Sequence, residues 1–403
     1  MNIGKLVAAC ACAVALANPA FAAPGKVWPI AGVAPELEDF SDLKPLADAI
    51  GNARVVALGE QTHGGREEYL LKARVLKFLH QKMGFDVLLL ESGFYDIARL
   101  AQRVEQGERL DDIAPGNVFF MYARTAEGRG MLQYFDRQRA AGKPMALGGI
   151  DAQHTGELSK TELLQRLHGH LQQAAPALGS GPAWEHYARL AQPLLAMQRT
   201  PPAAAQQAAF HQQSAALKAT LCRADTGPVT YSGNAFWCQV VKSVEAQATS
   251  YWSADHDYQR DNQMGDNAIW LAERMYPGRK VVIWAHTVHV ARGFERTPRN
   301  LQAGEVMHRR WKGDYKVVQF SGAGGEILDF ATMNTLPLPA IPPDSLEASL
   351  AKEQYAVLGL TPGARVTQPQ FSYEYLVQPG AELGVNWDVL LFIRKITPVS
   401  MAR

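Results

Sequence analysis

Six short apolar runs of strand type recur along the chain, and most of them are continuously apolar rather than alternating. They span residues 55–58, 87–91, 145–150, 281–285, 316–320 and 389–393. Such runs suit strands that are buried on both faces, as in a parallel sheet covered by helices. Between the first two runs, residues 67–83 place apolar side chains at helical spacing and are followed by Gly84. We therefore predict a three-layer α/β/α fold in which a mostly parallel sheet lies between two layers of helices.

The pattern changes between about residues 156 and 276, where the apolar runs disappear. Ala, Gln, Leu, Lys and Arg dominate this segment with helical periodicity, and turn signals occur at 179–182 and 200–202. We predict a largely helical cap inserted into one α/β domain of residues 23–403. Aromatic residues of the cap are Trp184, Tyr187, Phe236, Trp237, Tyr251, Trp252 and Trp270. They either pack helices together or line a space for a bulky apolar ligand.

Residues 1–22 have the pattern of a secretory signal peptide. Lys5 precedes an apolar stretch at 6–16, and Ala20 and Ala22 form a small-residue cleavage site. We expect no membrane-spanning helix, because no segment approaches roughly 18 uninterrupted apolar residues. The mature protein is therefore expected to start near Ala23, to be periplasmic or secreted, and to have no stable membrane insertion. A lipoprotein box ending at Cys10 is the weaker alternative, since only a short apolar stretch precedes it.

Charge and cysteine content narrow the possible partners. Forty Lys and Arg residues balance 39 Asp and Glu residues, and no basic stripe stands out. Nucleic acid is therefore an unsuitable partner. After removal of the signal peptide, Cys222 and Cys238 remain. They form either a disulfide, as is common in exported proteins, or two buried thiols.

Glutamate and histidine residues follow three of the predicted strands. Glu60 and His63 come after the first run, Glu91 ends the second, and His286 and His289 follow the run at 281–285. Ligands bind at the carboxyl ends of parallel strands, so we expect these side chains at one edge, with Glu91 beside Glu60 if their strands pair. A histidine held by a carboxylate can act as a general base. The alternatives are carboxylates that cap helices and histidines that are hydrogen-bonded in the core.

Other motifs support or weaken particular chemistries. Arg74 and Arg260 could stabilise a developing oxyanion, or they could be solvated surface residues. The sequence has no Gly-x-Ser-x-Gly elbow, no phosphate-binding Gly-x-x-x-x-Gly-Lys motif, and no His-Glu-x-x-His motif. A serine hydrolase of the common type and nucleotide cofactors are therefore disfavoured. The histidines with Glu91 could still assemble an open zinc or iron site.

Several motifs together resemble the erythromycin esterase family. They are Gly59-Glu60-Gln61-Thr62-His63-Gly64, the helix with Arg74, Glu91, Gly149-x-Asp151, Arg260-Asp261-x-x-Met264 and Trp284-Ala285-His286-x-x-His289-Val290. The resemblance implies a helical cap on an α/β fold, hydrolysis of macrolide lactones, and no cofactor or required metal. It also implies that His63 activates water and that Glu60, Glu91, Arg74, His286 and His289 line the cleft.

On this resemblance, Glu60 and Glu91 orient His63 and the water, and His286, His289 and Arg74 polarise the ester carbonyl or its oxyanion. Asp151 and Arg260 are expected to contact substrate. Two positions depart from the usual pattern of the family: Lys72 replaces an arginine, and Thr287 replaces an asparagine. Lysine lacks the bidentate fork of arginine, and threonine lacks the paired donor and acceptor of an amide. We therefore expect altered substrate contacts at Lys72 and Thr287.

The resulting hypothesis is a metal-independent hydrolase that cleaves a small-molecule ester or macrolide lactone with water activated by His63. One alternative is a metal-dependent hydrolase that uses His63, Glu91, His286 and His289. The other is a non-catalytic protein that binds haem or another hydrophobic ligand under the cap.

Overall fold

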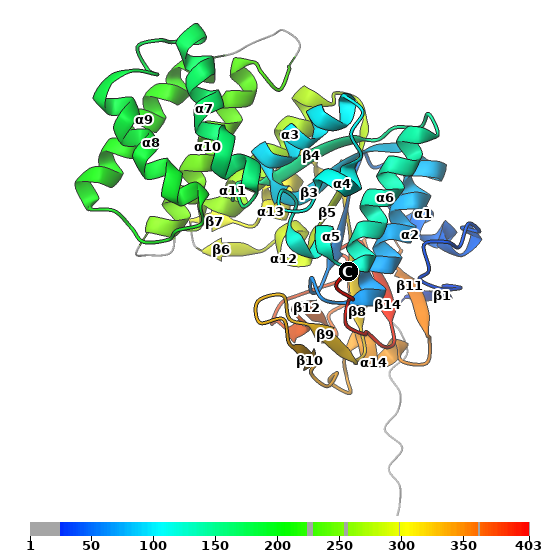
Figure 1. The fold of residues 1–403 in the computed structure, drawn as a ribbon. Helices are drawn as coiled ribbons and strands as arrows, with labels where there is room; N and C mark the ends of the chain where they lie inside the picture. The colour runs from blue at the N-terminus through cyan, green and yellow to red at the C-terminus, as the bar shows by residue number, and fades with distance from the viewer. Residues whose placement is uncertain (1–24, 224–228, 254–256, 298, 362, 403) are drawn as a thin grey trace, which may run out of the picture.

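An eight-stranded sheet forms the centre of the molecule in this computed structural model, which describes residues 25–223, 229–253, 257–297, 299–361 and 363–402 (Figure 1). The strand order is β1 (Lys26–Pro29), β11 (Tyr355–Gly359), β14 (Val389–Ile393), β8 (Tyr315–Gly322), β2 (Val55–Glu60), β5 (Lys280–His286), β3 (Phe85–Gly93) and β4 (Ala146–Asp151). Neighbouring strands from β14 to β4 are parallel, and β11 and β1 extend one edge antiparallel. The predicted mostly parallel α/β fold is confirmed, and the predicted signal peptide at 1–22 lies outside the described residues.

Helices cover both faces of this sheet. Alternate residues of β2 point to opposite faces, so Val55 and Ala57 belong to one apolar core, and Val56 and Leu58 to the other. The first core includes α10 (Asn234–Trp252), α11 (Gln259–Trp270) and α13 (Ala303–Trp311). The second includes α1 (Lys44–Ile50), α2 (Arg66–Met83), α4 (Leu110–Ile113), α5 (Phe120–Arg124) and α6 (Ala126–Ala140). Residues of α3 (Phe94–Glu105) contribute to both cores.

The helix α2 shows how local sequence sets the position of the site loop. It begins after Gly65, carries Glu67 and Glu68 in its first turn, and ends at Gly84 in the left-handed conformation. Acidic residues suit the positive end of the helix dipole, and glycine adopts a positive φ without a Cβ penalty. The helix therefore starts three residues after His63 and directs its amino end toward the same edge of the sheet as that histidine.

Only helices connect β4 to β5 among the described residues of this interval. They are α7 (Glu157–Ala174), α8 (Gly181–Leu195), α9 (Ala204–Leu221), α10 and α11, followed by a π-helical turn at Leu271–Met275. Helices α7 to α10 form the green lobe beside the sheet in Figure 1. Six of the seven aromatic residues expected in the cap are buried, and Tyr187 stacks on Phe210 at 4.7 Å between ring centroids. These aromatic side chains therefore pack the helices together; the seventh, Tyr251, is half-buried.

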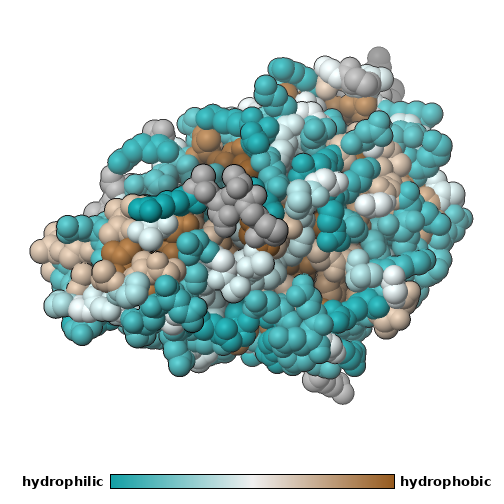
Figure 2. Space-filling model, turned by 90° about the horizontal axis from the view of Figure 1, so that it is seen from above, coloured by the Kyte–Doolittle hydropathy of each residue, from teal (hydrophilic) through white to brown (hydrophobic). Residues whose placement is uncertain are grey.

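Cys222 and Cys238 form a disulfide that joins the end of α9 to α10, with 5.0 Å between their Cα atoms. No helix among the described residues is both long enough and apolar enough to span a membrane. The face seen in Figure 2 is mostly hydrophilic, and hydrophobic side chains show only in separate areas.

Small hairpins and the last residues of the chain surround the edge where β2 ends. The hairpins are β6 (Glu295–Thr297) with β7 (Asn300–Leu301), β9 (Glu326–Leu328) with β10 (Thr335–Pro337), and β12 (Phe371–Tyr373) with β13 (Leu376–Val377). Two short helices, α12 (Thr287–Val290) and α14 (Leu346–Leu350), complete this region.

Residues 396–402, here called the C-terminal strap, cross the beginnings of α2 and α6. The backbone N–H of Arg66 donates to Thr397 O at 2.8 Å, and that of Ala126 donates to Ser400 O at 2.7 Å. The N–H groups of Val399 and Leu328 both donate to Gly64 O, at 3.0 and 3.2 Å. A Cβ at residue 64 would lie 1.8 Å from Leu328 O, so only glycine fits there. The strap and the β9–β10 hairpin therefore hold the loop next to His63.

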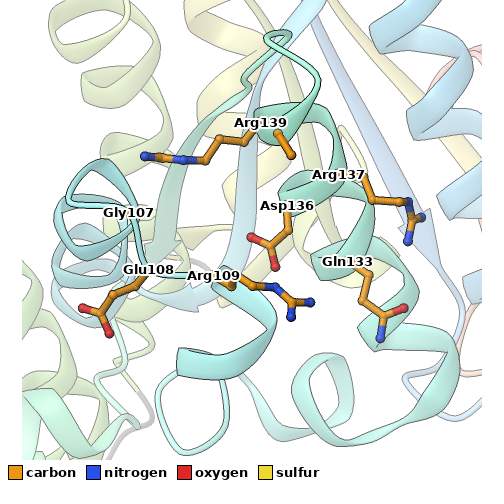
Figure 3. Close-up of a pocket in the computed structure, with 8 residues that line it drawn as sticks. Gly107, Glu108, Arg109, Gln133, Asp136, Arg137 and Arg139 are labelled. Atoms are coloured by element: carbon orange, nitrogen blue, oxygen red, sulfur yellow. The ribbon is translucent and has the colours of Figure 1, made fainter.

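A hollow of about 570 Å³ lies at the surface between α4 and α6 (Figure 3). Its lining is rich in charged residues, including Arg109, Arg137 and Arg139. Asp136 in this hollow accepts the backbone N–H groups of Leu110 and Asp111, at 2.7 and 3.0 Å. The hollow shares no lining residue with the histidine pocket described below, and its half-buried Asp136 stabilises the start of α4.

Candidate active site

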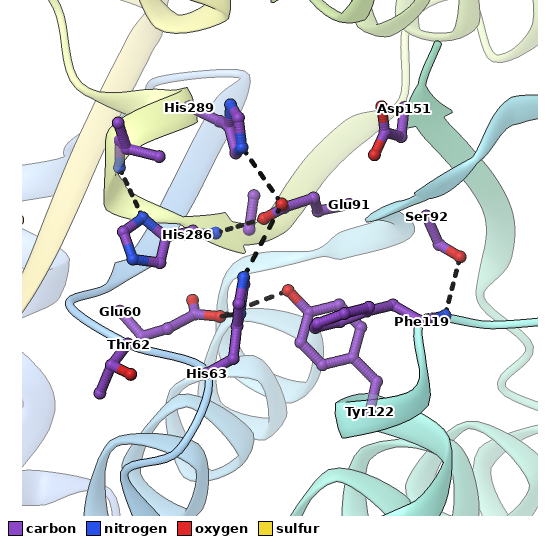
Figure 4. A network of polar contacts seen from close by, with 12 residues as sticks. Glu60, Thr62, His63, Glu91, Ser92, Phe119, Tyr122, Asp151, His286 and His289 are labelled. Carbon is purple, nitrogen blue, oxygen red and sulfur yellow. Dashed lines mark hydrogen bonds and ion pairs between the residues drawn. The ribbon is translucent and has the colours of Figure 1, made fainter. Parts of the chain in front are cut away.

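Three histidines and two glutamates meet at the carboxyl ends of the central strands (Figure 4). The ring centroids of His63 and His286 are 5.1 Å apart. Strand β5 lies between β2 and β3, so the strands of Glu60 and Glu91 do not pair, and the condition for placing these two residues directly side by side is not met. Glu91 reaches the histidines across the end of β5, where its Oε2 accepts the backbone N–H of His286 at 2.7 Å. This hydrogen bond brings side chains from three strands to one place.

The fully buried carboxylate of Glu60 contacts the His63 ring. Glu60 Oε1 lies 3.1 Å from His63 Nδ1, and Oε2 pairs with Lys72. Burial opposes ionisation of Glu60, but the Lys72 ammonium lowers the pKa of this carboxyl to about 2. An ionised carboxylate only accepts hydrogen bonds, so it selects the His63 tautomer with the proton on Nδ1. Nε2 of His63 then carries a free lone pair, and it lies 3.9 Å from Glu91 Oε1.

Glu91 is held in its ionised form by cationic neighbours. His289 Nε2 lies 3.2 Å from Glu91 Oε1, and the guanidinium of Arg260 lies 3.6 Å from the same atom. Burial opposes ionisation of Glu91, but His289 and Arg260 hold its pKa well below the usual range. Glu91 is therefore a carboxylate at neutral pH, with the lone pair of His63 beside it.

His289 is the protonated histidine of the group. Its Nδ1 lies 2.5 Å from Asp261 Oδ1, and its Nε2 faces Glu91. Burial opposes the charged form, but Asp261 and Glu91 raise the pKa of His289 to about 10. A carboxylate on each nitrogen makes His289 an imidazolium that donates from both sides.

His286 is the neutral counterpart. Its Nδ1 accepts the backbone N–H of Val288 at 3.0 Å, at the start of α12. Burial and the nearby His63 lower the pKa of His286 to about 3. The ring is therefore neutral, with its proton on Nε2, and it can donate a hydrogen bond to an oxygen bound in the pocket.

These residues line a pocket of about 660 Å³. Asp151 and Arg260 form a two-point ion pair in its wall, with contacts of 2.8 and 2.6 Å. Phe119 and Phe330 stand edge-on to His63 on another side, with ring centroids at 4.7 and 5.3 Å. Phe330 is 39% exposed and comes from the tip between β9 and β10. The pocket thus combines aromatic side chains against His63 with charged groups in the same lining.

Three residues expected to contact substrate or its oxyanion do not line the pocket. The guanidinium of Arg74 pairs with Asp42 at 2.7 Å and donates to Gly32 O and Asp39 O, which holds residues 32–42 against α2. Lys72 is fully buried against Glu60, and its ammonium lies over the Trp284 ring at 4.4 Å. Residues two positions apart on a helix point about 200° apart, so Lys72 and Arg74 cannot serve the same site.

Thr287 is also buried outside the pocket. Its hydroxyl donates to Gln319 at 3.0 Å and accepts from the Trp387 indole at 2.9 Å. The predicted substrate contacts of Lys72 and Thr287 and the predicted catalytic role of Arg74 are therefore corrected: all three residues support the structure around the pocket.

Sequence reasoning missed four residues that touch the central group. Tyr122 donates to Glu60 Oε1 at 3.3 Å, Asp261 binds His289, and Phe119 and Phe330 contact the His63 ring. Asp261 follows Arg260 in a motif that was recognised, so its position was a usable signal. The three aromatic residues lie in segments without a motif, and only the folded chain brings them to the site.

Glu68 lies buried beneath the site loop, where its Oε1 accepts the backbone N–H of Gln61 at 3.0 Å. Burial raises the pKa of Glu68 from 4.5 to about 8. The folded protein therefore keeps this carboxyl neutral at pH values where the unfolded chain ionises it. Its contribution to stability is fully present below pH 4.5 and is lost as the pH rises through about 8.

Glu68→Gln is expected to reduce this loss, since glutamine keeps the acceptor for Gln61 and cannot ionise. Urea unfolding at about pH 5 and about pH 8.5 measures the difference in free energy of unfolding for each protein. Glu36→Gln, at an exposed position, is the control and should behave as the wild type. The same pH difference in Glu68→Gln as in the wild type would contradict the assignment.

Comparisons with known proteins agree with this architecture. The family model of erythromycin esterase matches residues 80–383. The putative hydrolase YbfO of Bacillus subtilis (strain 168) is 23% identical over 347 residues, which cover 77% of this chain and 74% of that protein. Erythromycin esterase type II of Escherichia coli is 29% identical over 119 residues, which cover 30% of this chain and 28% of that protein.

Solved structures show the same fold. A succinoglycan biosynthesis protein has a TM-score of 0.72 at 21% identity, with 93% of this chain and 95% of that chain covered. A mutant of the erythromycin esterase EreC in its open conformation has a TM-score of 0.71 at 18% identity, with 90% and 96% covered. The hydrolase relatives support hydrolase activity. Because the family model spans most of the α/β domain and its cap, this chain belongs to the erythromycin esterase family.

Proposed function

We propose that this protein hydrolyses a carboxylic ester, or the lactone of a macrolide, with water activated by His63. The observation that carries the proposal is the Lys72–Glu60–His63 series, in which a fully buried carboxylate holds Nδ1 and leaves Nε2 free to accept a proton. A base of this kind must lie within reach of the water that it activates. His63 lines the pocket, which meets that requirement.

Glu91 is suited to position the water. A water bound beside His63 Nε2 would donate one hydrogen to that nitrogen and the other to Glu91 Oε1, since these two atoms are 3.9 Å apart. His289 and Arg260 keep Glu91 ionised, so it accepts rather than donates. When Nε2 takes the first proton, the hydroxide attacks the ester carbonyl. His63 then returns the proton to the leaving alkoxide.

His286 is suited to stabilise the negative charge that develops on the carbonyl oxygen. Its Nδ1 is occupied by the backbone of Val288, so a neutral ring keeps its proton on Nε2. Its pKa of about 3 keeps the ring neutral at physiological pH. A fixed donor that does not reorganise during the reaction is the form of stabilisation that contributes most in such sites, at about 10²–10³ in kcat for one donor.

The chemistry of the donor set supports a reaction without a metal. Metal-binding imidazoles are neutral and have one free nitrogen, whereas His289 is cationic and both of its nitrogens face carboxylates. Within the described ranges, no group of three His, Cys, Asp or Glu residues has an arrangement that could hold a metal ion. We therefore expect activity to survive chelation.

Incubation of the mature protein with macrolides and simple aryl and alkyl esters, with and without a chelator, tests the proposal. We expect at least one substrate to gain the mass of one water, as measured by mass spectrometry, at the same rate in both conditions. Loss of turnover with the chelator and recovery with one added metal would instead establish a metal-dependent hydrolase. Tight binding of a hydrophobic ligand or haem without turnover of any ester would establish a binding protein.

A further inference from the structure

A second cavity of about 230 Å³ opens from the active-site pocket toward the helical lobe. Here called the side pocket, it is lined by Gln153, Arg199, Gln247, Ser250, Tyr251, Ser253, Tyr258 and Arg260. Four of these residues, Gln153, Arg199, Tyr258 and Arg260, also line the active-site pocket. The two spaces are therefore continuous, and a group bound in the side pocket can belong to a molecule whose ester lies beside His63.

The lining of the side pocket is polar and carries positive charge. It contains two arginines, and none of its eight lining residues in the described part of the chain is a carboxylate. Asp151, an acid of the active-site pocket, already accepts two hydrogen bonds from Arg260. Arg199 therefore adds a cationic charge to this space that Asp151 does not neutralise.

The side chain of Arg199 is exposed and packs against an aromatic ring. Its guanidinium lies 4.7 Å from the centroid of the Tyr251 ring, and the Tyr251 hydroxyl donates to the sulfur of Met197 at 3.2 Å. A cation over an aromatic face keeps its N–H groups available at the edge of the guanidinium plane. Gln247, on the same wall, is fixed by hydrogen bonds to the backbone of His154 and Leu194. The wall thus presents the exposed Arg199 guanidinium beside a glutamine that is fixed by two hydrogen bonds.

Resting on the proposed ester hydrolysis, we propose that the side pocket binds an anionic group of the substrate and that Arg199 determines this specificity. The matching ligand chemistry is a carboxylate, sulfate or phosphate, because these groups accept the parallel N–H bonds of a guanidinium. With a water occupying about 30 Å³, a space of about 230 Å³ has room for roughly seven or eight non-hydrogen atoms. The proposed substrate is therefore an ester with a short acidic arm.

Aryl acetates provide the test, because their ester is common to all members while the para substituent varies. The substituents are carboxylate, carboxymethyl and carboxyethyl, and each acid is paired with its primary amide. The wild type is expected to have the higher kcat/KM for the acid of at least one pair. Arg199→Gln is expected to lower kcat/KM for that acid by about 10- to 100-fold, mainly through KM, and to lower it for the amide much less.

Arg189→Gln is the matched control, because Arg189 is exposed on α8 of the same lobe and lines neither pocket. This substitution should leave kcat/KM unchanged for both the acid and the amide. Turnover with no preference for any acid, or an equal loss for acid and amide in Arg199→Gln, would overturn the side-pocket proposal while leaving ester hydrolysis in place.

Calorimetry with the free para-hydroxyphenyl carboxylic acids separates the two proposals. Binding that weakens in Arg199→Gln, together with no hydrolysis of any ester by the wild type, would support the anionic subsite and refute the proposed function. The wild-type protein could instead hydrolyse the aryl acetates that carry an amide substituent, bind none of the free acids and show no preference for an acid substituent. That result would refute the subsite alone.

Discussion

Replacing His63 by asparagine is expected to lower kcat by about 10²–10⁴-fold on any ester that the wild-type protein hydrolyses, which is the usual contribution of a positioned base. Asparagine can still donate to Glu60, so the ionised carboxylate keeps a partner, but its amide cannot take a proton from water. The effect should fall on kcat more than on KM, because the base acts in the transition state rather than in substrate binding.

Initial rates over a range of substrate concentrations, together with thermal melting of the purified variant, measure this effect. His186→Asn is the control, since His186 is on α8 and outside the active-site pocket. It should retain the rate of the wild type. A His63→Asn enzyme with the wild-type kcat would show that another group activates the water.

Lys72→Met is expected to lower the free energy of unfolding by about 3–5 kcal/mol, because it removes the partner of a fully buried carboxylate. Methionine fills a similar volume, so the lost charge is the main change. Loss of the ammonium also removes the interaction that holds the pKa of Glu60 down against burial. Glu60 then tends to be protonated, and the tautomer of His63 is no longer selected, so kcat should also fall.

A double variant separates the two consequences. Lys72→Met combined with Glu60→Gln leaves no buried charge at this position, so we expect stability to recover toward that of the wild type while activity stays low. Urea unfolding at pH 7 gives the stabilities, and ester hydrolysis gives the activities. Lys82→Met, at an exposed position of the same helix, should change stability by less than about 0.5 kcal/mol. A single Lys72→Met variant as stable as the wild type would contradict the buried ion pair.

Most of the sheet could be predicted from the sequence, because its six mutually parallel strands lie one per predicted run and most of these runs are continuously apolar. The order of the strands could not, since apolar runs carry no information about which neighbour a strand takes. For that reason β5 was not expected between β2 and β3, although it is the strand that joins Glu60 and Glu91 through His286. The antiparallel strands β11 and β1, which extend the sheet beyond β14, do not correspond to any of the six predicted runs.

The site was predictable where polar residues follow apolar strands and less so where a helix supplies them. His63, Glu91, His286 and His289 meet as expected. The contacts of residues on α2 could not be assigned from the sequence, because they depend on how the helix is rotated about its own axis. That rotation directs Lys72 toward Glu60 and Arg74 toward Asp42. The pKa values of the two later histidines were equally hidden, because burial lowers that of His286 and a pair of carboxylates raises that of His289.

The C-terminal strap has a consequence for synthesis on the ribosome. Gly64 and the start of α2 are made early, whereas Thr397 and Val399, which bind them, are made more than 300 residues later. A nascent chain can form β2 and α2 long before that time, but its His63 loop lacks these hydrogen bonds until the strap leaves the exit tunnel. Completion of the catalytic geometry is therefore delayed until translation has passed the strap.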